Sequence, residues 1–206
     1  MDFDTDIAIV GGGLNGTALA LALAYAGQRV TLIDRLAVKT RKNAAFDGRS
    51  YALALTSTRL MAGVGIWDTL EATAQPMLDI KVTDGRVGNG PSPFFMHFDH
   101  AEIEEGPMGY MVEDRHLRPA LMNAVAQNKA ITRIEGTGAV DQTVLPTGIT
   151  LALENGENIT ARLVVGADGR GTGVGARAGI KRTEWAYRQT ALVCAIEHDL
   201  PHHGVA

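Results

Sequence analysis

The sequence predicts an α/β fold in which a parallel β-sheet is covered by helices. An apolar run over residues 7–10 leads directly into a Gly-x-Gly-x-x-Gly pattern at residues 11–16. An alanine- and leucine-rich segment over residues 17–26 is typical of a helix, and a second apolar run over residues 30–33 ends on Asp34. A strand, a glycine turn, a helix and an acid-ended strand in this order predict a βαβ unit that binds a dinucleotide.

Each glycine of the pattern has a physical reason. Gly11 permits the tight turn after the first strand, Gly13 lets the backbone approach a pyrophosphate, and Gly16 lets the helix pack close to the sheet. The helix N-terminus offers N–H groups to the phosphates. The other residues expected in this cofactor-binding loop are Gly12, Leu14 and Asn15.

Composition restricts the class of protein. The chain has 206 residues, of which 46% are hydrophobic and 20% charged, as in an ordinary globular protein. With 19 basic and 23 acidic residues the net charge is -4, and no basic cluster stands out, so nucleic acid is not an expected partner. Cys194 cannot form an internal disulfide, which fits a reducing cytoplasm; it is expected to be a small core residue in an apolar strand. We expect no signal peptide and no membrane-spanning helix.

The middle of the chain reads as a mixture of short elements. Residues 35–47 predict a loop, and residues 56–77 predict two short helices broken at Gly63 and Gly65. Residues 80–83 and 94–98 predict strands of a small additional β-sheet. The turn between these strands is expected to contain Gly88, Gly90, Pro91 and Pro93.

The second half returns to the αβ pattern. Residues 111–112 predict a short extended piece, and residues 115–127 carry apolar side chains at helical spacing. Residues 149–153 and 159–165 predict a hairpin joined at Asn155-Gly156. Residues 191–196 predict a strand that begins a further structural unit.

Three separated segments carry a family resemblance. They are residues 11–16 with Asp34, then Asp47-Gly48-Arg49, then Gly166-Ala167-Asp168-Gly169. Together they resemble the FAD-dependent aromatic hydroxylases of the para-hydroxybenzoate hydroxylase type. The resemblance implies a Rossmann-like FAD-binding domain, a parallel sheet with helices, accompanied by the small β-sheet.

The resemblance also implies residue roles. Asp34 would bind the adenosine ribose and Arg35 would lie beside the adenine. Arg49 would neutralise the pyrophosphate or reach towards the flavin ring, and Arg115 lies near a position that touches flavin in related enzymes. The remaining residues implied are Asp168 and Gly169, which would serve both FAD and the pyridine nucleotide.

Two further segments narrow the resemblance to the ubiquinone-biosynthesis hydroxylases. These are Gly109-Tyr110-Met111-Val112-Glu113 and the segment from Trp185 to Val193. The group uses NAD(P)H and O2 to hydroxylate a polyprenylated phenol through a flavin C4a-hydroperoxide. Because the flavin performs the bond chemistry, no catalytic residue is named. The resemblance implies a cytoplasmic protein, peripheral to the inner membrane from which the substrate is drawn, and association with a biosynthetic complex.

Departures from the family pattern leave alternatives open. The family carries an arginine soon after the segment matching Gly169, and here it is absent unless Arg177 replaces it. The family also continues into a longer substrate domain, so residues 1–182 are expected to be the FAD-binding domain, with an insert over about 78–100, and residues 183–206 the incomplete start of the substrate domain. The alternatives are another FAD oxidoreductase of this fold, such as a geranylgeranyl reductase or halogenase type, and a non-catalytic flavin-binding subunit. We expect no metal site, because no cysteine and no carboxylates at ligand spacing accompany the histidines.

Overall fold

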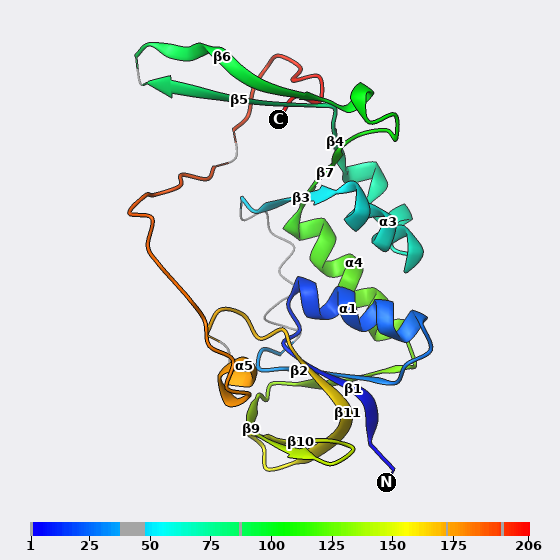
Figure 1. Ribbon diagram of the computed structural model, residues 1–206. Helices are drawn as coiled ribbons and strands as arrows, with labels where there is room; N and C mark the ends of the chain where they lie inside the picture. The colour runs from blue at the N-terminus through cyan, green and yellow to red at the C-terminus, as the bar shows by residue number, and fades with distance from the viewer. Residues whose placement is uncertain (1, 38–47, 87, 172, 195) are drawn as a thin grey trace. The chain divides into compact units, whose positions relative to one another are not determined.

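The chain divides into two units in the computed structural model, which describes residues 2–37, 48–86, 88–171, 173–194 and 196–206. The first unit comprises residues 1–44 and 118–191, and the second comprises residues 45–117 and 192–206 (Figure 1). The domain boundaries predicted from the sequence remain a prediction.

The first unit is built on a six-stranded sheet with the order β8-β2-β1-β11-β10-β9. The strands β8, β2, β1 and β11 run parallel, whereas β10 pairs antiparallel with both β11 and β9. The bounds are β1 Thr5–Val10, β2 Val30–Asp34, β8 Ile131–Glu135, β9 Ala139–Leu145, β10 Gly148–Leu153 and β11 Asn158–Gly166.

The register brings the carboxyl ends of the parallel strands to one edge. Val10 on β1 is level with Ile33 on β2 and with Gly166 on β11, while Asp34 is level with Glu135 on β8. The predicted ligand-binding segments follow three of these strands. In a parallel sheet this edge is where ligands bind.

The two inner strands β1 and β2 are buried on both faces, which explains their largely apolar sequence, whereas β8 and β11 have exposed positions. α1 (Leu14–Tyr25) contacts β1, β2 and β8, and α5 (Gly173–Arg177) contacts β9 and β11. Figure 1 shows β9 and β10 curling away on the side of the sheet opposite α1. Ile9 and Ile33 are fully buried at the centre. The buried cluster across the sheet contains Ala8, Val10, Ile33, Ala139, Leu151, Leu153, Ala161 and Val174.

The second unit has two small antiparallel sheets. The first has the order β3-β7-β4, and the second is the hairpin of β5 and β6. After β3 the chain forms α3 and the short turns η1 and η2, and η3 follows β6. α4 begins in this unit and continues into the first. The bounds are β3 Ser50–Ala54, α3 Leu55–Gly63, η1 Trp67–Thr69, η2 Glu71–Thr73, β4 Gln75–Met77, β5 Asp79–Arg86, β6 Gly90–Asp99, η3 His100–Glu102, β7 Gly109–Glu113 and α4 Asp114–Gln127.

The fold-class prediction is confirmed, and several elements within it are confirmed or corrected. The hairpin at Asn155-Gly156 forms between β10 and β11, with Gly156 at φ +86°. The second helix predicted within residues 56–77 is wrong: η1 and η2 are single 3₁₀ turns and β4 pairs with β7. Pro91 and Pro93 lie inside β6 rather than in a turn, which a two-stranded sheet tolerates because its outer edges need no N–H.

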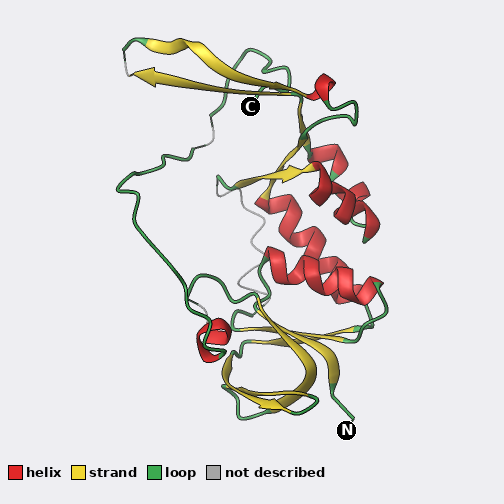
Figure 2. Cartoon of the chain, in the orientation of Figure 1, coloured by secondary structure: helices red, strands yellow, loops and turns green. Residues whose placement is uncertain are grey.

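The predicted strand over residues 191–196 is also wrong for its described residues. Figure 2 draws this segment as a loop, and residues 180–194 have no regular secondary structure. Leu192 and Val193 are exposed, and so is Cys194, which was expected in the core. Apolar character alone does not make a strand without a neighbouring strand to accept its backbone hydrogen bonds. Of the predicted loop at residues 35–47, residues 38–47 lie outside the described part of the chain.

Among the described residues, the structure contains no helix that is both long and apolar enough to cross a membrane. The longest helices, α1 and α4, have 12 and 14 residues.

Asp4 connects the N-terminal segment to β11 and yields a pH prediction. Its Oδ2 accepts hydrogen bonds from the Thr160 hydroxyl at 2.6 Å and the Thr160 N–H at 2.8 Å, and these bonds hold the pKa of Asp4 below its ordinary value. A depressed folded-state pKa contributes stability above the unfolded-state pKa, and that contribution is lost as pH falls through the folded pKa. Thr160→Val should raise the Asp4 pKa in an NMR titration, whereas Thr143→Val on β9, which β10 separates from β11, should leave it unchanged.

Candidate dinucleotide site

The glycine loop between β1 and α1 is shaped by close backbone contacts. Gly11 adopts φ +111°, and a Cβ there would overlap the carbonyl oxygen of Ala167. A Cβ on Gly16 would overlap the carbonyl oxygen of Gly11. Gly13 differs, because no atom of the described residues lies within 4 Å of the position of its missing Cβ. Gly11 and Gly16 therefore allow backbone segments of the chain to pack closely against each other, while Gly13 leaves open space beside the backbone.

The N-terminus of α1 follows this open space. Gly13 is the N-cap residue, its backbone is extended, and no side chain in the described part of the chain caps the helix. The first turn also contains no acidic residue. The first N–H groups of a helix have no intrahelical acceptor, so this end of α1 suits an anion such as a phosphate.

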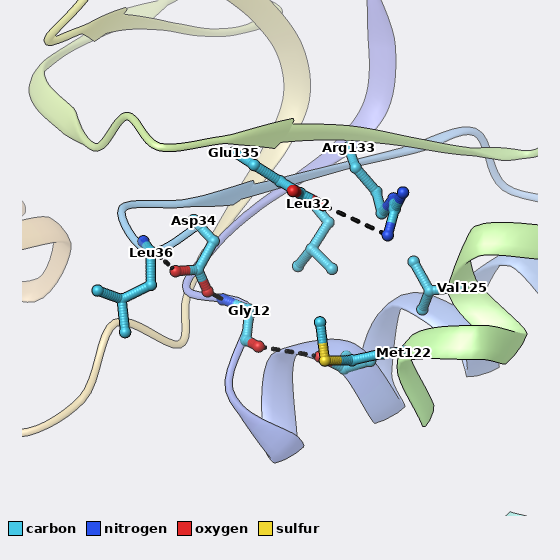
Figure 3. Close-up of a pocket in the computed structure, with 9 residues that line it drawn as sticks. Gly12, Leu32, Asp34, Leu36, Met122, Val125, Arg133 and Glu135 are labelled. Carbon is cyan, nitrogen blue, oxygen red and sulfur yellow. Dashed lines mark hydrogen bonds and ion pairs between the residues drawn. The ribbon is translucent and has the colours of Figure 1, made fainter. Parts of the chain in front are cut away.

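Asp34 is held at the end of β2 by two backbone groups. Its Oδ2 accepts the N–H of Gly12, and its Oδ1 accepts the N–H of Leu36 at 2.7 Å (Figure 3). The side chain is largely buried, so the carboxylate has a fixed direction. A cavity of about 30 Å³ next to it, lined by Leu32, Met122 and other residues drawn in Figure 3, has room for about one water molecule and none for a nucleotide.

Arg35 is paired across the same edge of the sheet. Its Nε lies 3.2 Å from Oε1 of Glu154, and Oε2 of Glu154 accepts the N–H of Gly138 at 3.0 Å. Neither Gly138 nor Glu154 was predicted from the sequence as a site residue. The available signal was the pair Gly136 and Gly138, which follows β8 at the carboxyl edge.

Asp168 follows β11, and only one of its two carboxylate oxygens has hydrogen-bond partners within the described structure. Its Oδ2 accepts the N–H groups of Gly173 at 3.0 Å and Val174 at 3.3 Å, so it holds the start of α5. Its Oδ1 is buried and has no hydrogen-bond partner within the described structure. The next residue, Gly169, has φ +89°, a conformation that glycine adopts without strain.

These segments surround one cavity of about 490 Å³ at the carboxyl edge of the sheet. Of the predicted site residues, Gly11, Gly13, Asp34, Arg35, Asp168 and Gly169 line it. Gly12, Leu14, Asn15 and Gly16 belong to the same loop and helix start but do not line it. The other lining residues are Val10, Ile33, Leu36, Gly138, Ala139, Ala167, Gly171, Gly173 and Arg177.

The donor set of this cavity fits a dinucleotide. Uncapped helix N–H groups and open space at Gly13 suit a pyrophosphate. Carboxylate oxygens of Asp34 and Asp168 suit ribose and ribityl hydroxyls, and the buried, unpartnered Oδ1 of Asp168 has an unused acceptor position. The site therefore fits FAD by its chemistry.

Arg49 and Arg115 belong to the second unit and are described within it. Nη2 of Arg49 lies 3.5 Å from Oδ2 of Asp114, whose Oδ1 accepts the hydroxyl of Tyr51 at 2.9 Å. Arg115 forms an ion pair with Glu113. Asp47, the first residue of the predicted Asp47-Gly48-Arg49 segment, lies outside the described residues.

Comparison with known protein families decides the classification. The model of a family described as "FAD binding domain" matches residues 4–202. This chain belongs to the FAD-binding domain family. The match confirms the predicted family and FAD as its cofactor, while the roles of individual residues remain predictions.

Similar proteins include hydroxylases of ubiquinone biosynthesis. The chain is 42% identical over 201 residues to ubiquinone hydroxylase UbiL of Rhodospirillum rubrum, covering 98% of this chain and 46% of the relative. It is 33% identical to 3-demethoxyubiquinol 3-hydroxylase of Escherichia coli over 94% of this chain and 48% of the relative. The chain thus spans about half the length of these curated relatives.

A solved structure shares the architecture. The flavin-dependent monooxygenase PieE, in complex with FAD and substrate, superimposes with a TM-score of 0.63 and 25% identity. The similarity covers 85% of this chain and 32% of PieE. The fold of this chain therefore also occurs in a flavoenzyme of known structure.

The glycine geometry generates a paired prediction. Gly16→Ala should destabilise the fold by about 1–3 kcal/mol, because its Cβ would overlap backbone that cannot move aside. Gly13→Ala has φ -69° and open space, so it should cost less than about 1 kcal/mol without ligand yet still weaken FAD binding. Denaturant melts of the two apoproteins, followed by FAD titration of Gly13→Ala, check both parts. Equal melts for the two variants would contradict the packing role of Gly16.

Proposed function

We propose that this chain is the FAD-binding part of a monooxygenase that hydroxylates a polyprenylated phenol in ubiquinone biosynthesis, with NAD(P)H and O2 as co-substrates. The observation that carries the proposal is the cavity where the glycine loop, Asp34 and the Asp168-Gly169 segment meet at one edge of the sheet. The similarity to ubiquinone hydroxylase UbiL over 98% of the chain supports the choice of substrate class.

In this proposal the chain binds and orients the cofactor. Gly13 and the first N–H groups of α1 receive the pyrophosphate, Asp34 binds the adenosine ribose, and Arg35 lies beside the adenine. Asp168 and Gly169 bind the part of FAD beyond the pyrophosphate, where Asp168 accepts a ribityl hydroxyl. When bound, FAD supplies the redox chemistry that takes electrons from NAD(P)H and transfers one oxygen atom of O2 to the ring.

Arg49 and Arg115 are proposed to approach the flavin half of the cofactor. Arg49 shares the buried carboxylate of Asp114 with Tyr51, which holds the guanidinium in a defined position. A planar guanidinium pairs with phosphate through two N–H groups. Residues 1–182 are proposed as the FAD-binding domain, with an insert at about 78–100, and residues 183–206 as the beginning of the substrate domain.

The ring position belongs to the proposal as well. The motifs resemble those of 2-octaprenyl-6-methoxyphenol hydroxylase, and the E. coli relative is a 3-hydroxylase by name. Product analysis with a set of differently substituted polyprenyl phenols assigns the position.

Turnover separates this function from its alternatives. The intact protein, loaded with FAD, should oxidise NAD(P)H faster when a prenylated phenol is present and should place one atom from ¹⁸O2 in the product. The matched control is the O-methyl ether of the same phenol, which cannot ionise to an electron-rich phenolate and should not stimulate. Saturation of a prenyl double bond without oxygen incorporation would indicate a reductase. Flavin binding without phenol-stimulated oxidation would indicate a non-catalytic subunit.

The substrate class implies a place of action on the cytoplasmic face of the inner membrane. A polyprenyl tail partitions into the bilayer because burial of each CH₂ is favourable by about 0.8 kcal/mol, so the enzyme has to reach its substrate there, alone or within a biosynthetic complex. Flotation of the intact protein with vesicles containing a polyprenyl phenol should recover more protein than flotation with vesicles lacking it. Equal recovery in the two cases contradicts substrate-linked membrane association.

A further inference from the structure

Two charged side chains in the dinucleotide cavity retain unused hydrogen-bonding groups. Oδ1 of Asp168 and Nη2 of Arg177 are both buried, and neither has a hydrogen-bond partner in the described structure. Both residues line the cavity that also contains Gly11 and Gly13. A buried donor or acceptor without a partner costs free energy, and such atoms are rare in native proteins unless a ligand or water satisfies them.

The rest of the Arg177 side chain is held in place. Its Nε donates to Oε1 of Gln142 on β9 at 3.3 Å. Its guanidinium also lies against Gly173, where a Cβ would overlap Nη1. A glycine at position 173 therefore makes room for the guanidinium, and Gln142 fixes one edge of it. The N–H groups of Nη2 are therefore left to donate to a ligand.

The ligand chemistry follows from what surrounds Nη2. Asp168 is an acceptor and Arg177 a donor, so the ligand carries both a hydroxyl and an anionic oxygen. The same cavity contains the start of α1, whose N–H groups also favour an anion. A guanidinium matches the oxygens of a phosphate with two parallel hydrogen bonds.

We infer that Arg177 is a cofactor-binding residue whose guanidinium donates to the pyrophosphate of FAD from the side opposite α1, and that Asp168 accepts a hydroxyl of the same molecule. The inference rests on the proposed function, because it requires FAD in this cavity. It adds a positive side chain from α5 to the backbone N–H groups that the start of α1 offers to a phosphate.

The experiment measures FAD binding to the intact apoprotein by quenching of flavin fluorescence. Arg177→Gln should weaken FAD binding by about tenfold, as expected for loss of one charge-assisted hydrogen bond, and should flatten the salt dependence. Arg177→Lys should recover part of the loss because it retains the charge. The matched control is Arg162→Gln: Arg162 is exposed on β11 and lines a neighbouring groove with Arg177 but not the glycine-loop cavity, so FAD affinity should be unchanged.

Competition distinguishes binding of phosphate from a general structural role. After correction for the FAD affinity of each protein, the dissociation constant of ADP should be about tenfold higher for Arg177→Gln than for wild type, while that of adenosine, which has no phosphate, should be the same for both. If Arg177→Gln does not fold, Gly173→Ala displaces the guanidinium without removing it and should weaken FAD binding in the same direction.

Three results would overturn the inference: wild-type FAD affinity in Arg177→Gln, an equal loss in Arg162→Gln, or an equal loss for adenosine and ADP. Failure of the wild-type protein to bind FAD would instead overturn the proposed function. The two failures are therefore separate.

Discussion

The close contact of three backbone segments at Gly11, Gly16 and Ala167 is the constraint on which the site depends. The carbonyl oxygen of Gly11 lies where a Cβ of Gly16 would be, and Ala167 lies where a Cβ of Gly11 would be. The N–H of Gly11 donates to Ile33 at 2.8 Å, and the N–H of Ala167 donates to Val10 at 2.7 Å. These contacts place the first turn of α1 and the segment after β11 on the same edge of the sheet.

The distribution of charge follows from this arrangement. The N-terminus of α1 has partial positive charge, because the first N–H groups of a helix have no acceptor within the helix. Asp34 and Asp168 stand at the ends of β2 and β11, where their carboxylates accept backbone N–H groups and remain fixed. The cavity thus offers donors for phosphate near the helix and acceptors for hydroxyls beside it, in an order that matches a dinucleotide.

The second unit shows how a buried charge is maintained by several partners. Asp114 is almost fully buried, and it accepts the Tyr51 hydroxyl and pairs with Arg49. Its own N–H donates to the carbonyl oxygen of Arg49 at 3.0 Å. A buried carboxylate without such partners would be costly, so Arg49 and Asp114 are mutually dependent in position.

The sequence by itself determined the elements whose signals are local. The glycine spacing, the helix after it and the acid at the end of β2 depend on contacts within about 30 residues of chain, and they predicted the βαβ unit correctly. The hairpin at Asn155-Gly156 was predictable for the same reason, since the turn residues themselves require its backbone conformation. Local sequence also predicted the FAD-binding family.

Only the tertiary structure decided which distant residues complete the site. Glu154 pairs with Arg35 because β10 folds back beside β11, and Arg177 enters the cavity because α5 packs on β9 and β11. The apolar residues 191–194 form no strand, although their composition predicted one, since a strand requires a partner for its backbone groups. Pairing and packing between remote segments decide these outcomes, and a local pattern contains no information about which remote partner is present.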